Sequence, residues 1–404
     1  MTSGATLRLA RQARGFSQEQ LAGMAGVSRQ AVSAVESGQS DPSLRVALAL
    51  ARALGMTVEE LFGPEDMTPA VSARLVLPAD GPGMSGATDM RVTLAPIGNS
   101  FVALPLSGPT ASRAGFLPTG GMVAAPATGS VPALGAARAS APVAESAAEG
   151  GQRPVAAVRM IGPPRPTLVV AGCDPALPLL EAPLSLLDPP LAFSWWPCTS
   201  HEALRLAADG VVHAAGAHLL GRHGGYNTGP ASELLPGGGE VFGFSAWREG
   251  LVLRPDVAAG ITGLADVVQR GLRLVNREPG AEARLLLDRE LAGLGVDADR
   301  VPGYQSQATG HLQVADAIAA GLADAGVASE PAALAYGLAF VPLATERFDL
   351  VIPAEQAGSR EVQALTRVLS SRWLLDQLAS LPGYDPAPCG QHVATLPRAG
   401  RVRS

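Results

Sequence analysis

The sequence predicts a multi-domain chain with an all-α head of five short helices, a short β-rich or disordered middle and an α/β body. Apolar residues recur at helical spacing up to about residue 62. Between residues 105 and 154 the composition turns to Ala, Gly, Pro, Ser and Thr. From Thr167, short apolar runs alternate with amphipathic stretches, which is typical of repeated βα units. The 404 residues exceed what one hydrophobic core usually holds.

Capping residues delimit the helices of the head, residues 1–66. The expected N-caps and first residues are Ser17, Ser28, Ser43 and Thr57, and the expected C-terminal glycines are Gly15, Gly38 and Gly55. The fifth helix should end near Phe62. We expect Leu7, Leu9 and Met24 to turn toward the core of this bundle.

The segment SQEQLAGMAGVSRQAVSAVESGQSDPSL resembles the phage-repressor type of helix-turn-helix, the Xre-like family, over residues 5–63. The resemblance implies a double-stranded DNA operator as partner, with the second helix of the motif in the major groove. Because members of this family usually dimerise, it also implies a homodimer on a palindromic site. The DNA-binding residues carried over are Gln18, Ser28, Arg29, Gln30, Ser33 and Ala34.

Each of these positions has an expected role. Arg29 could pair with a guanine edge and Gln30 with an adenine edge, whereas Ala34 could touch only a thymine methyl. Gln18 stands where the family contacts phosphate, and Glu36 is expected to be a structural partner inside the domain. The alternative interpretation is a small bundle that binds protein rather than DNA.

Charge is distributed unevenly along the chain. Residues 1–56 hold six arginines and three acidic residues, a net charge of +3, although the whole chain carries −6. A basic head on an acidic body suits a DNA-binding domain joined to another function. The three cysteines show no CxxC spacing, and there is no apolar run of membrane-spanning length and no signal peptide. We therefore expect a cytoplasmic protein without disulfides.

The middle and the tail carry weak signals. Residues 67–104 form a short β-rich segment with three or four expected strands, too few for an independent barrel. Residues 105–154 are predicted to be a flexible linker or insertion, and residues 385–404 a disordered tail.

The body, residues 155–384, contains a series of strand–loop–helix units, among them TLVVAGCDPAL and RLVNREPGAEARLLLDRELAGLG. Ligands of such sheets lie beyond the carboxyl ends of the strands. The loops there combine small residues, hydroxyls and helix starts, a combination that suits a small anion.

Three runs, NREPGAEARLLLD, GYQSQATGHLQVADAIAAGLADAGVA and AYGLAFVPLATERFDLVIP, resemble the periplasmic-binding-protein-like sensor domains fused to bacterial regulators. The branch is akin to molybdate- and tungstate-binding proteins, and the resemblance covers residues 167–382. It implies a bilobal type II fold, in which GFSAWREGLVLRP crosses between the lobes and AFVPLATERFDLVIP returns. The ligand-binding residues we expect are Cys173, Asp174, Thr199, Ser200, His218, Tyr226, Asn276, Arg277, Gly280, Arg284, Thr309 and His311.

The expected ligand is a small oxyanion, with molybdate or tungstate favoured. One departure weakens that expectation, because Gly280-Ala281-Glu282-Ala283-Arg284 stands where related domains carry Gly-Ser-Gly-Thr-Arg. Two hydroxyls are lost there, and Glu282 would repel an oxyanion if it faced the cleft.

The other cysteine, histidine and tryptophan residues of the body are interpreted mainly as parts of its core. Cys173 and Cys198 could approach each other or hold a soft metal, but small buried cysteines are common. We expect His213 to be a satisfied strand residue, and one of Trp195 and Trp196 to line the cleft. We expect no metal, no cofactor beyond a bound oxyanion and no catalytic residue, since neither a GxSxG motif nor a carboxylate pair is present.

The sequence therefore predicts a regulator that senses a small ligand in its body and alters operator binding by its head. Two alternatives stay open: a small-molecule enzyme whose DNA-binding head serves autoregulation, and a ligand-independent dimeric repressor.

Overall fold

The computed structural model describes residues 3–62, 70–77, 90–106, 117–123, 153–221 and 225–398. Most of the expected linker, residues 105–154, lies outside the described residues. The chain divides into two compact units, one of residues 1–71 with 157–160 and one of residues 72–156 with 161–404. Among the described residues, no helix is both long and apolar enough to cross a membrane.

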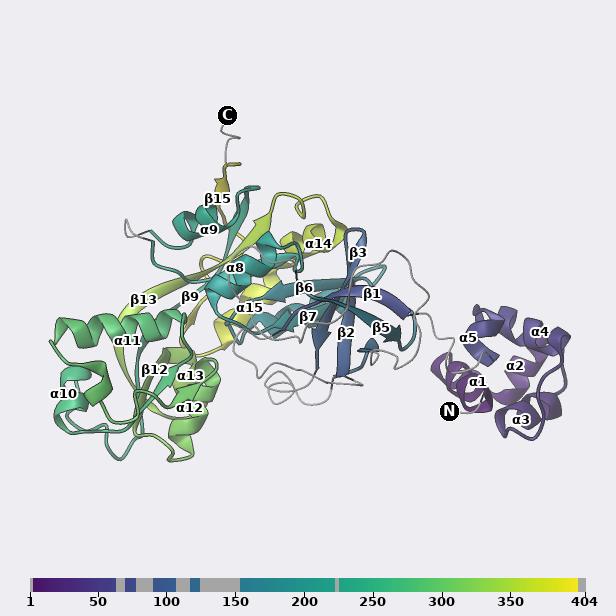
Figure 1. Cartoon of the computed structure of the whole chain (residues 1–404), viewed down its shortest axis with the longest axis horizontal. Coiled ribbons are helices and arrows are strands. Elements are labelled where there is room, and N and C mark those ends of the chain that lie inside the picture. Colours follow the sequence, from purple (N-terminus) through teal and green to yellow (C-terminus); the bar gives the residue numbers. More distant parts are fainter. Residues whose placement is uncertain are drawn as a thin grey trace, which may run out of the picture. The chain divides into compact units, whose positions relative to one another are not determined.

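Five short helices form the head, as predicted (Figure 1). They are α1 (Ser3–Ala13), α2 (Gln18–Ala25), α3 (Arg29–Glu36), α4 (Leu44–Leu54) and α5 (Val58–Phe62). The side chains of Ser17, Ser28 and Ser43 cap α2, α3 and α4 by accepting hydrogen bonds from backbone N–H groups. Buried residues such as Leu7, Leu21, Val32 and Leu50 make the core of the bundle.

Two residues that the sequence placed in this core are exposed instead. Leu9 is 53% and Met24 is 55% exposed, so the prediction of an inward position was wrong for both. Helices of this length bury only a narrow stripe, and Leu7 and Leu21 already fill it on α1 and α2.

The middle of the chain forms a closed five-stranded barrel in the order β1-β3-β2-β4-β5. Its strands are β1 (Ala70–Leu75), β2 (Met90–Ile97), β3 (Ser100–Pro105), β4 (Gly121–Val123) and β5 (Val155–Met160). The expectation that the strands were too few for a barrel was wrong, because β4 and β5 come from beyond residue 105 and close it. Residues 155–160, assigned to the body from the sequence, belong to this barrel.

The body is built on one ten-stranded sheet, with the path β11-β10-β12-β9-β13-β8-β6-β7. In the first lobe, β6 (Thr167–Ala171) pairs in parallel with β7 (Ala192–Trp196) and β8 (Ala214–Ala217). In the second lobe, β10 (Leu274–Arg277) pairs in parallel with β11 (Gln307–Ala308) and β12 (Ala325–Ser329). The predicted repeated βα units are confirmed in both lobes.

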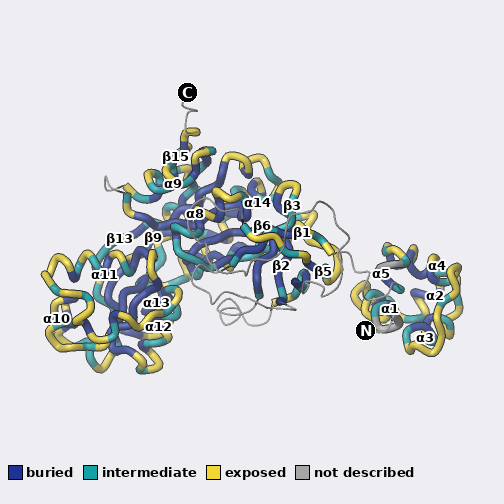
Figure 2. Tube along the Cα trace, in the orientation of Figure 1, coloured by how far each residue is buried: buried dark blue, intermediate teal, exposed yellow. Residues whose placement is uncertain are grey.

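Helices cover the sheet of each lobe. In the first lobe they are the 3-10 helix η3 (Leu177–Leu180) with α7 (Glu181–Ser185), α8 (Ser200–Ala208), α9 (Thr228–Leu234), α14 (Arg360–Leu369) and α15 (Arg372–Ser380). In the second lobe they are α10 (Leu264–Gln269), α11 (Glu282–Gly293), the 3-10 helix η4 (Ala298–Arg300), α12 (His311–Ala319) and α13 (Glu330–Ala335). Figure 2 shows the buried residues concentrated along the strands between these helices.

Two long strands join the lobes. β9 (Gly239–Leu253) and β13 (Ala339–Pro353) pair antiparallel along their whole length, from Ala339 opposite Leu253 to Pro353 opposite Gly239. Figure 1 shows them running from one lobe into the other. The predicted crossover segments are confirmed, and the middle of this ribbon lies where the lobes meet.

The tail is ordered over most of its length. β14 (Tyr384–Asp385) and β15 (His392–Leu396) both pair with β9. The prediction of disorder for residues 385–404 was therefore wrong up to Leu396. The pairing satisfies the edge groups of the early part of β9, which the polar composition of the tail did not suggest.

The barrel packs on the first lobe. Barrel residues such as Val76 and Ile97 share a core with Val169 of β6. Two arginines strengthen this contact: Arg74 donates to the carbonyl oxygens of residues 209 and 210 at 2.7 Å each, and Arg153 pairs with Asp209 and Glu202. The end of α8 is thereby fixed to the barrel.

Candidate functional site

The surface of α3 is the first candidate site. Arg29, Gln30 and Ser33 are exposed and Ala34 is half-buried. Val32 and Val35, on the opposite face, are buried in the head, as predicted. The helix therefore presents a polar face of the kind that reads base edges.

Ser28 and Gln18 use their side chains inside the head. The Ser28 hydroxyl accepts a hydrogen bond from the N–H of Ala31 at 3.1 Å, and Gln18 Nε2 donates to Glu36 Oε2 at 2.9 Å. Arg11 holds the same carboxylate through Nε at 2.6 Å and Nη2 at 3.0 Å. The predicted structural role of Glu36 is confirmed: it joins α1, α2 and α3.

The second candidate site is a group of three buried side chains where the lobes meet. Cys173 follows β6, His218 follows β8, and His311 begins α12 in the second lobe. The ligating atoms of the three residues all lie within 4.8 Å of one another. The sequence predicted all three as ligand-binding residues, and the structure brings them together.

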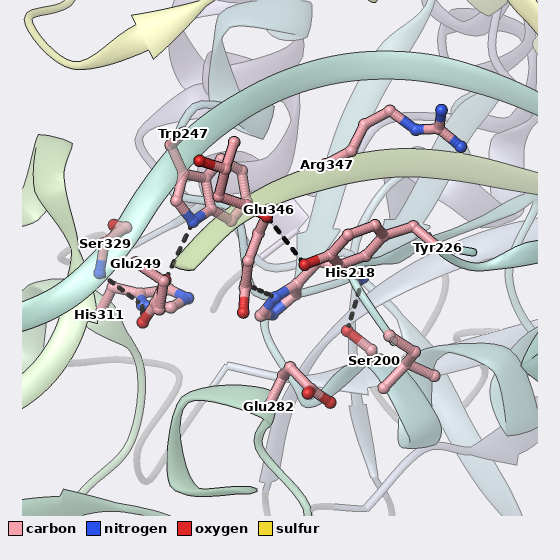
Figure 3. A network of polar contacts seen from close by, with 12 residues as sticks. Ser200, His218, Tyr226, Trp247, Glu249, Glu282, His311, Ser329, Glu346 and Arg347 are labelled. Carbon is pink, nitrogen blue, oxygen red and sulfur yellow. Dashed lines mark hydrogen bonds and ion pairs between the residues drawn. The ribbon is translucent and has the colours of Figure 1, made fainter. Parts of the chain in front are cut away.

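Glutamates from the crossing strands stand behind both imidazoles (Figure 3). His218 Nδ1 lies 2.5 Å from Glu346 Oε2, and His311 Nδ1 lies 3.5 Å from Glu249 Oε1. Trp247 Nε1 donates to the other oxygen of Glu249 at 3.0 Å. The exposed fractions of Glu249 and Glu346 are 0% and 2%. The N–H of Ser329 also donates to His311 Nδ1, at 3.2 Å. In both rings these contacts engage Nδ1, and Nε2 is the other ring nitrogen.

Burial and charge act in opposite directions on these groups. Burial raises the pKa of the Cys173 thiol, but the charges of His218 and His311 outweigh it and lower that pKa to about 5. Burial lowers the pKa of His311, and the charge of Glu249 raises it to about 9. In the same way, the charges of Cys173 and Glu346 hold the pKa of His218 well above its ordinary value despite burial. The group therefore stabilises a thiolate beside imidazoles.

A small cavity of about 50 Å³ adjoins this group. Cys173, His311, Trp195 and Arg277 are among its lining residues, whereas Trp196 is buried in the core, as the alternation along β7 predicted. Arg277 is 1% exposed, and its Nε and Nη2 donate to the carboxylate of Glu278 at 2.7 and 2.9 Å. Its Nη1 has no hydrogen-bond partner among the described residues.

Asp174 is fully buried beside Cys173 and is held by three donors. They are the N–H of Ala176, the hydroxyl of Ser245 and the hydroxyl of Tyr384, the last at 2.7 Å. Burial raises the pKa of Asp174 to about 6, although these hydrogen bonds favour its ionised form. Its side chain joins three segments of the first lobe and is not directed to the cavity lining.

The other predicted ligand-binding residues surround the group without meeting at one point. Thr199 caps α8, and the Ser200 hydroxyl accepts a hydrogen bond from the N–H of His218 at 3.2 Å. The Tyr226 hydroxyl donates to the carbonyl of Thr345 at 2.8 Å, so this side chain contacts β13. Asn276 donates to the carbonyl of Tyr304, and Arg284 donates to the carbonyl of Arg277. Gly280 has a positive φ of +81°, and Thr309 is exposed.

Two residues of the site were missed from the sequence. Glu249 and Glu346 lie within the two crossing strands, next to Arg248 and Arg347, and both glutamates are buried. A buried acid needs a partner, but the sequence does not show that these two acids are buried. Glu282, expected at a helix start, is indeed the first residue of α11, and Arg289 pairs with it at 2.9 Å.

Comparisons with known proteins agree with the two-part organisation. Residues 7–61 match the helix-turn-helix family, and residues 182–370 match the PBP superfamily domain. A solved structure of a putative phosphate ABC transporter substrate-binding protein with bound phosphate, from Clostridium perfringens, is 14% identical. That comparison covers 55% of this chain and 99% of the other, with a TM-score of 0.41.

Two curated relatives are similar to parts of the chain. An uncharacterized Bacillus subtilis protein is 32% identical over 144 residues, 36% of this chain, and the match spans 46% of that relative. An uncharacterized HTH-type transcriptional regulator of Methanocaldococcus jannaschii is 42% identical over 60 residues, 15% of this chain and 91% of its own length. The chain therefore belongs to the helix-turn-helix transcriptional regulators, with a periplasmic-binding-protein-like domain as its body.

Proposed function

We propose that this chain is a cytoplasmic, dimeric regulator whose body binds a small charged ligand between its lobes and thereby changes operator binding. The observation that carries the proposal is the group of Cys173, His218 and His311, because it contains residues of both lobes. A ligand that touches all three favours one lobe arrangement over another. Such a ligand can change operator affinity only as far as it binds one lobe arrangement more tightly than the other.

The barrel offers a route for the response. Ser200 at the start of α8 accepts a hydrogen bond from the backbone of His218, and the other end of α8 is held by Arg74 and Arg153. A shift at the site therefore reaches the barrel through one helix.

Molybdate or tungstate is the specific ligand that we propose to test first. Two features support an oxyanion: the buried, unpartnered Nη1 of Arg277 and the cavity at the start of α12. Acidic groups oppose it, since Glu278 pairs with Arg277 and its Oε2 accepts from the N–H of Gly310 at 3.4 Å. An oxyanion therefore needs additional positive charge in this cleft.

The test combines ligand binding with operator binding by the full chain. Thermal-shift screening and calorimetry would compare molybdate, tungstate, sulfate and organic anions, and operator affinity would be measured with and without each ligand. We expect tight binding without turnover and a change in operator affinity. Turnover would favour the enzyme alternative, and the absence of any ligand effect would favour the ligand-independent repressor.

A further inference from the structure

We propose that Cys173, His218 and His311 form a binding site for one transition-metal ion of the zinc or copper class. The inference goes beyond the proposed function, since it concerns metal binding whether or not the operator responds. It also departs from the sequence-based expectation of no metal.

Geometry is the first support. Three ligand atoms of the types that zinc and copper prefer, one sulfur and two imidazole nitrogens, lie within 4.8 Å of one another. The exposed fractions of Cys173, His218 and His311 are 7%, 2% and 1%. Atoms at tetrahedral positions about one ion lie about 3.3–3.8 Å apart, given zinc–ligand distances of about 2.0–2.3 Å. A small inward shift of the three side chains therefore completes a metal site.

The groups behind the ligands are the second support. Imidazoles that bind metals usually donate their other N–H to a carboxylate, which fixes the ring and its tautomer. Here Glu346 lies behind His218 Nδ1 at 2.5 Å and Glu249 behind His311 Nδ1 at 3.5 Å. The N–H of Ser329 also points at His311 Nδ1, at 3.2 Å. If Nδ1 carried a proton, it could no longer accept from Ser329 and would donate to Glu249 instead. The Oε1 atom of Glu249 has no hydrogen-bond partner among the described residues.

The orphaned atom of His311 is the third support. His311 Nε2 is buried and has no hydrogen-bond partner within the described part of the chain. Leaving a buried polar atom unpaired is unfavourable, so such an atom calls for a partner that the protein itself does not supply. A metal ion at Nε2 is that partner.

Space for a further ligand is the fourth support. The adjoining cavity leaves room for a fourth ligand, such as water or an anion, and the ion would supply the positive charge that an oxyanion lacks there.

The experiment uses the full chain, freed of metal with a chelator and titrated with Co²⁺ as a spectroscopic probe. We expect one Co²⁺ per chain, a thiolate-to-cobalt charge-transfer band and displacement by Zn²⁺. Cys173→Ser should abolish the band, whereas Cys389→Ser should keep it, because Cys389 is also buried but lies elsewhere, against the carbonyl of Leu369. Circular dichroism would establish that both variants fold.

A second variant tests the site without touching a ligand. Glu346→Gln should lower Zn²⁺ affinity about 10–100-fold, as is usual for the loss of a carboxylate behind a ligating imidazole. The matched exposed change Glu355→Gln should leave it unaltered. The proposal is overturned if the wild-type chain binds no stoichiometric Co²⁺ or if Cys173→Ser keeps the band. A chain that binds Co²⁺ but whose operator affinity ignores every ligand retains this site and loses the regulatory proposal.

Discussion

His213 Nδ1 accepts a hydrogen bond from the backbone N–H of Val169 at 3.0 Å. The backbone N–H of His213 in turn donates to the backbone carbonyl of Val169 at 2.9 Å. The imidazole thus takes the place of a backbone acceptor between β6 and the start of β8. His213 is 1% exposed, and burial lowers its pKa from 6.5 to about 4. The predicted role of a satisfied strand residue is confirmed.

This contact predicts a pH-dependent contribution to stability. The unfolded chain protonates His213 below about pH 6.5, whereas the folded chain resists protonation until about pH 4. Since the unfolded state binds more protons in that window, the free energy of unfolding falls as the pH drops from about 6.5 to about 4, by up to about 3 kcal/mol. Chemical unfolding of the wild type and His213→Asn, whose amide oxygen can still accept from Val169, should show a flatter dependence in the variant. Parallel pH profiles would contradict this.

The Arg11–Glu36 pair predicts a local loss of stability in the head. Burial raises the pKa of Glu36, but the hydrogen bonds from Arg11 and Gln18 lower it overall. The pair therefore stabilises the head above the pKa of an unfolded glutamate, and the contribution disappears as the pH falls through the lower folded pKa. Glu36→Gln should lower the stability of the head by about 1–3 kcal/mol at neutral pH.

Hydrogen exchange measured by mass spectrometry would locate that loss in the full chain. Amides of α1 and α3 should exchange faster in Glu36→Gln, whereas those of the body should not change. Glu19→Gln, at an exposed position on α2, is the matched control and should have little effect. Equal exchange in both variants would show that the pair contributes nothing.

The contact between the barrel and α8 predicts that Arg153→Ala loosens that helix, because Arg153 pairs with Glu202 in its first turn and with Asp209 at its C-terminal end. The Arg153 guanidinium lies 2.8 Å from Asp209 and 3.0 Å from Glu202, and all three side chains are partly exposed. Because solvent screens such pairs, we expect a loss of only about 1 kcal/mol. Faster hydrogen exchange in the peptide covering residues 200–210 would report it. Arg372→Ala, which breaks a highly exposed pair with Asp376, should leave that peptide unchanged.

The same variant tests the proposed route from the ligand site to the barrel. If α8 transmits the response, Arg153→Ala should reduce the effect of a bound ligand on operator affinity without weakening ligand binding itself. Ligand binding would be followed by calorimetry on the same preparation. An unchanged ligand effect on operator affinity would exclude this route.

Local signals made the head and the body predictable. Serine caps and left-handed glycines such as Gly26 and Gly55 set helix ends by short-range geometry, and apolar runs such as β6 indicate buried parallel strands without tertiary information. The barrel was missed because it needs β4 and β5, which are separated from β1 to β3 along the chain. The pairing of β15 with β9 was missed for the same reason.

The candidate site divides in the same way. Cys173, His218 and His311 were predicted because each lies at a strand end or a helix start, where ligands of α/β sheets collect. Their convergence on one another depends on how the two lobes close, which no local pattern encodes. Glu249 and Glu346 were missed because their partners lie on other segments, 62 residues away for His311 and 128 for His218.

The exposed face of α3 carries the prediction for DNA binding. Replacing Arg29 and Gln30 with alanine should remove two base contacts, each typically worth about 1–3 kcal/mol of discrimination, and so abolish sequence-specific binding. The operator would first be selected from random duplexes with the wild-type chain, and affinity would then be measured at several salt concentrations. Arg14→Ala removes a positive charge from the segment after α1 and should weaken binding to all sequences alike, with base preference retained. Calorimetry with the body's ligand should give the same affinity in all three proteins. If the double variant keeps the base preference of the wild type, α3 is not the reading helix and the protein-binding interpretation of the head gains support.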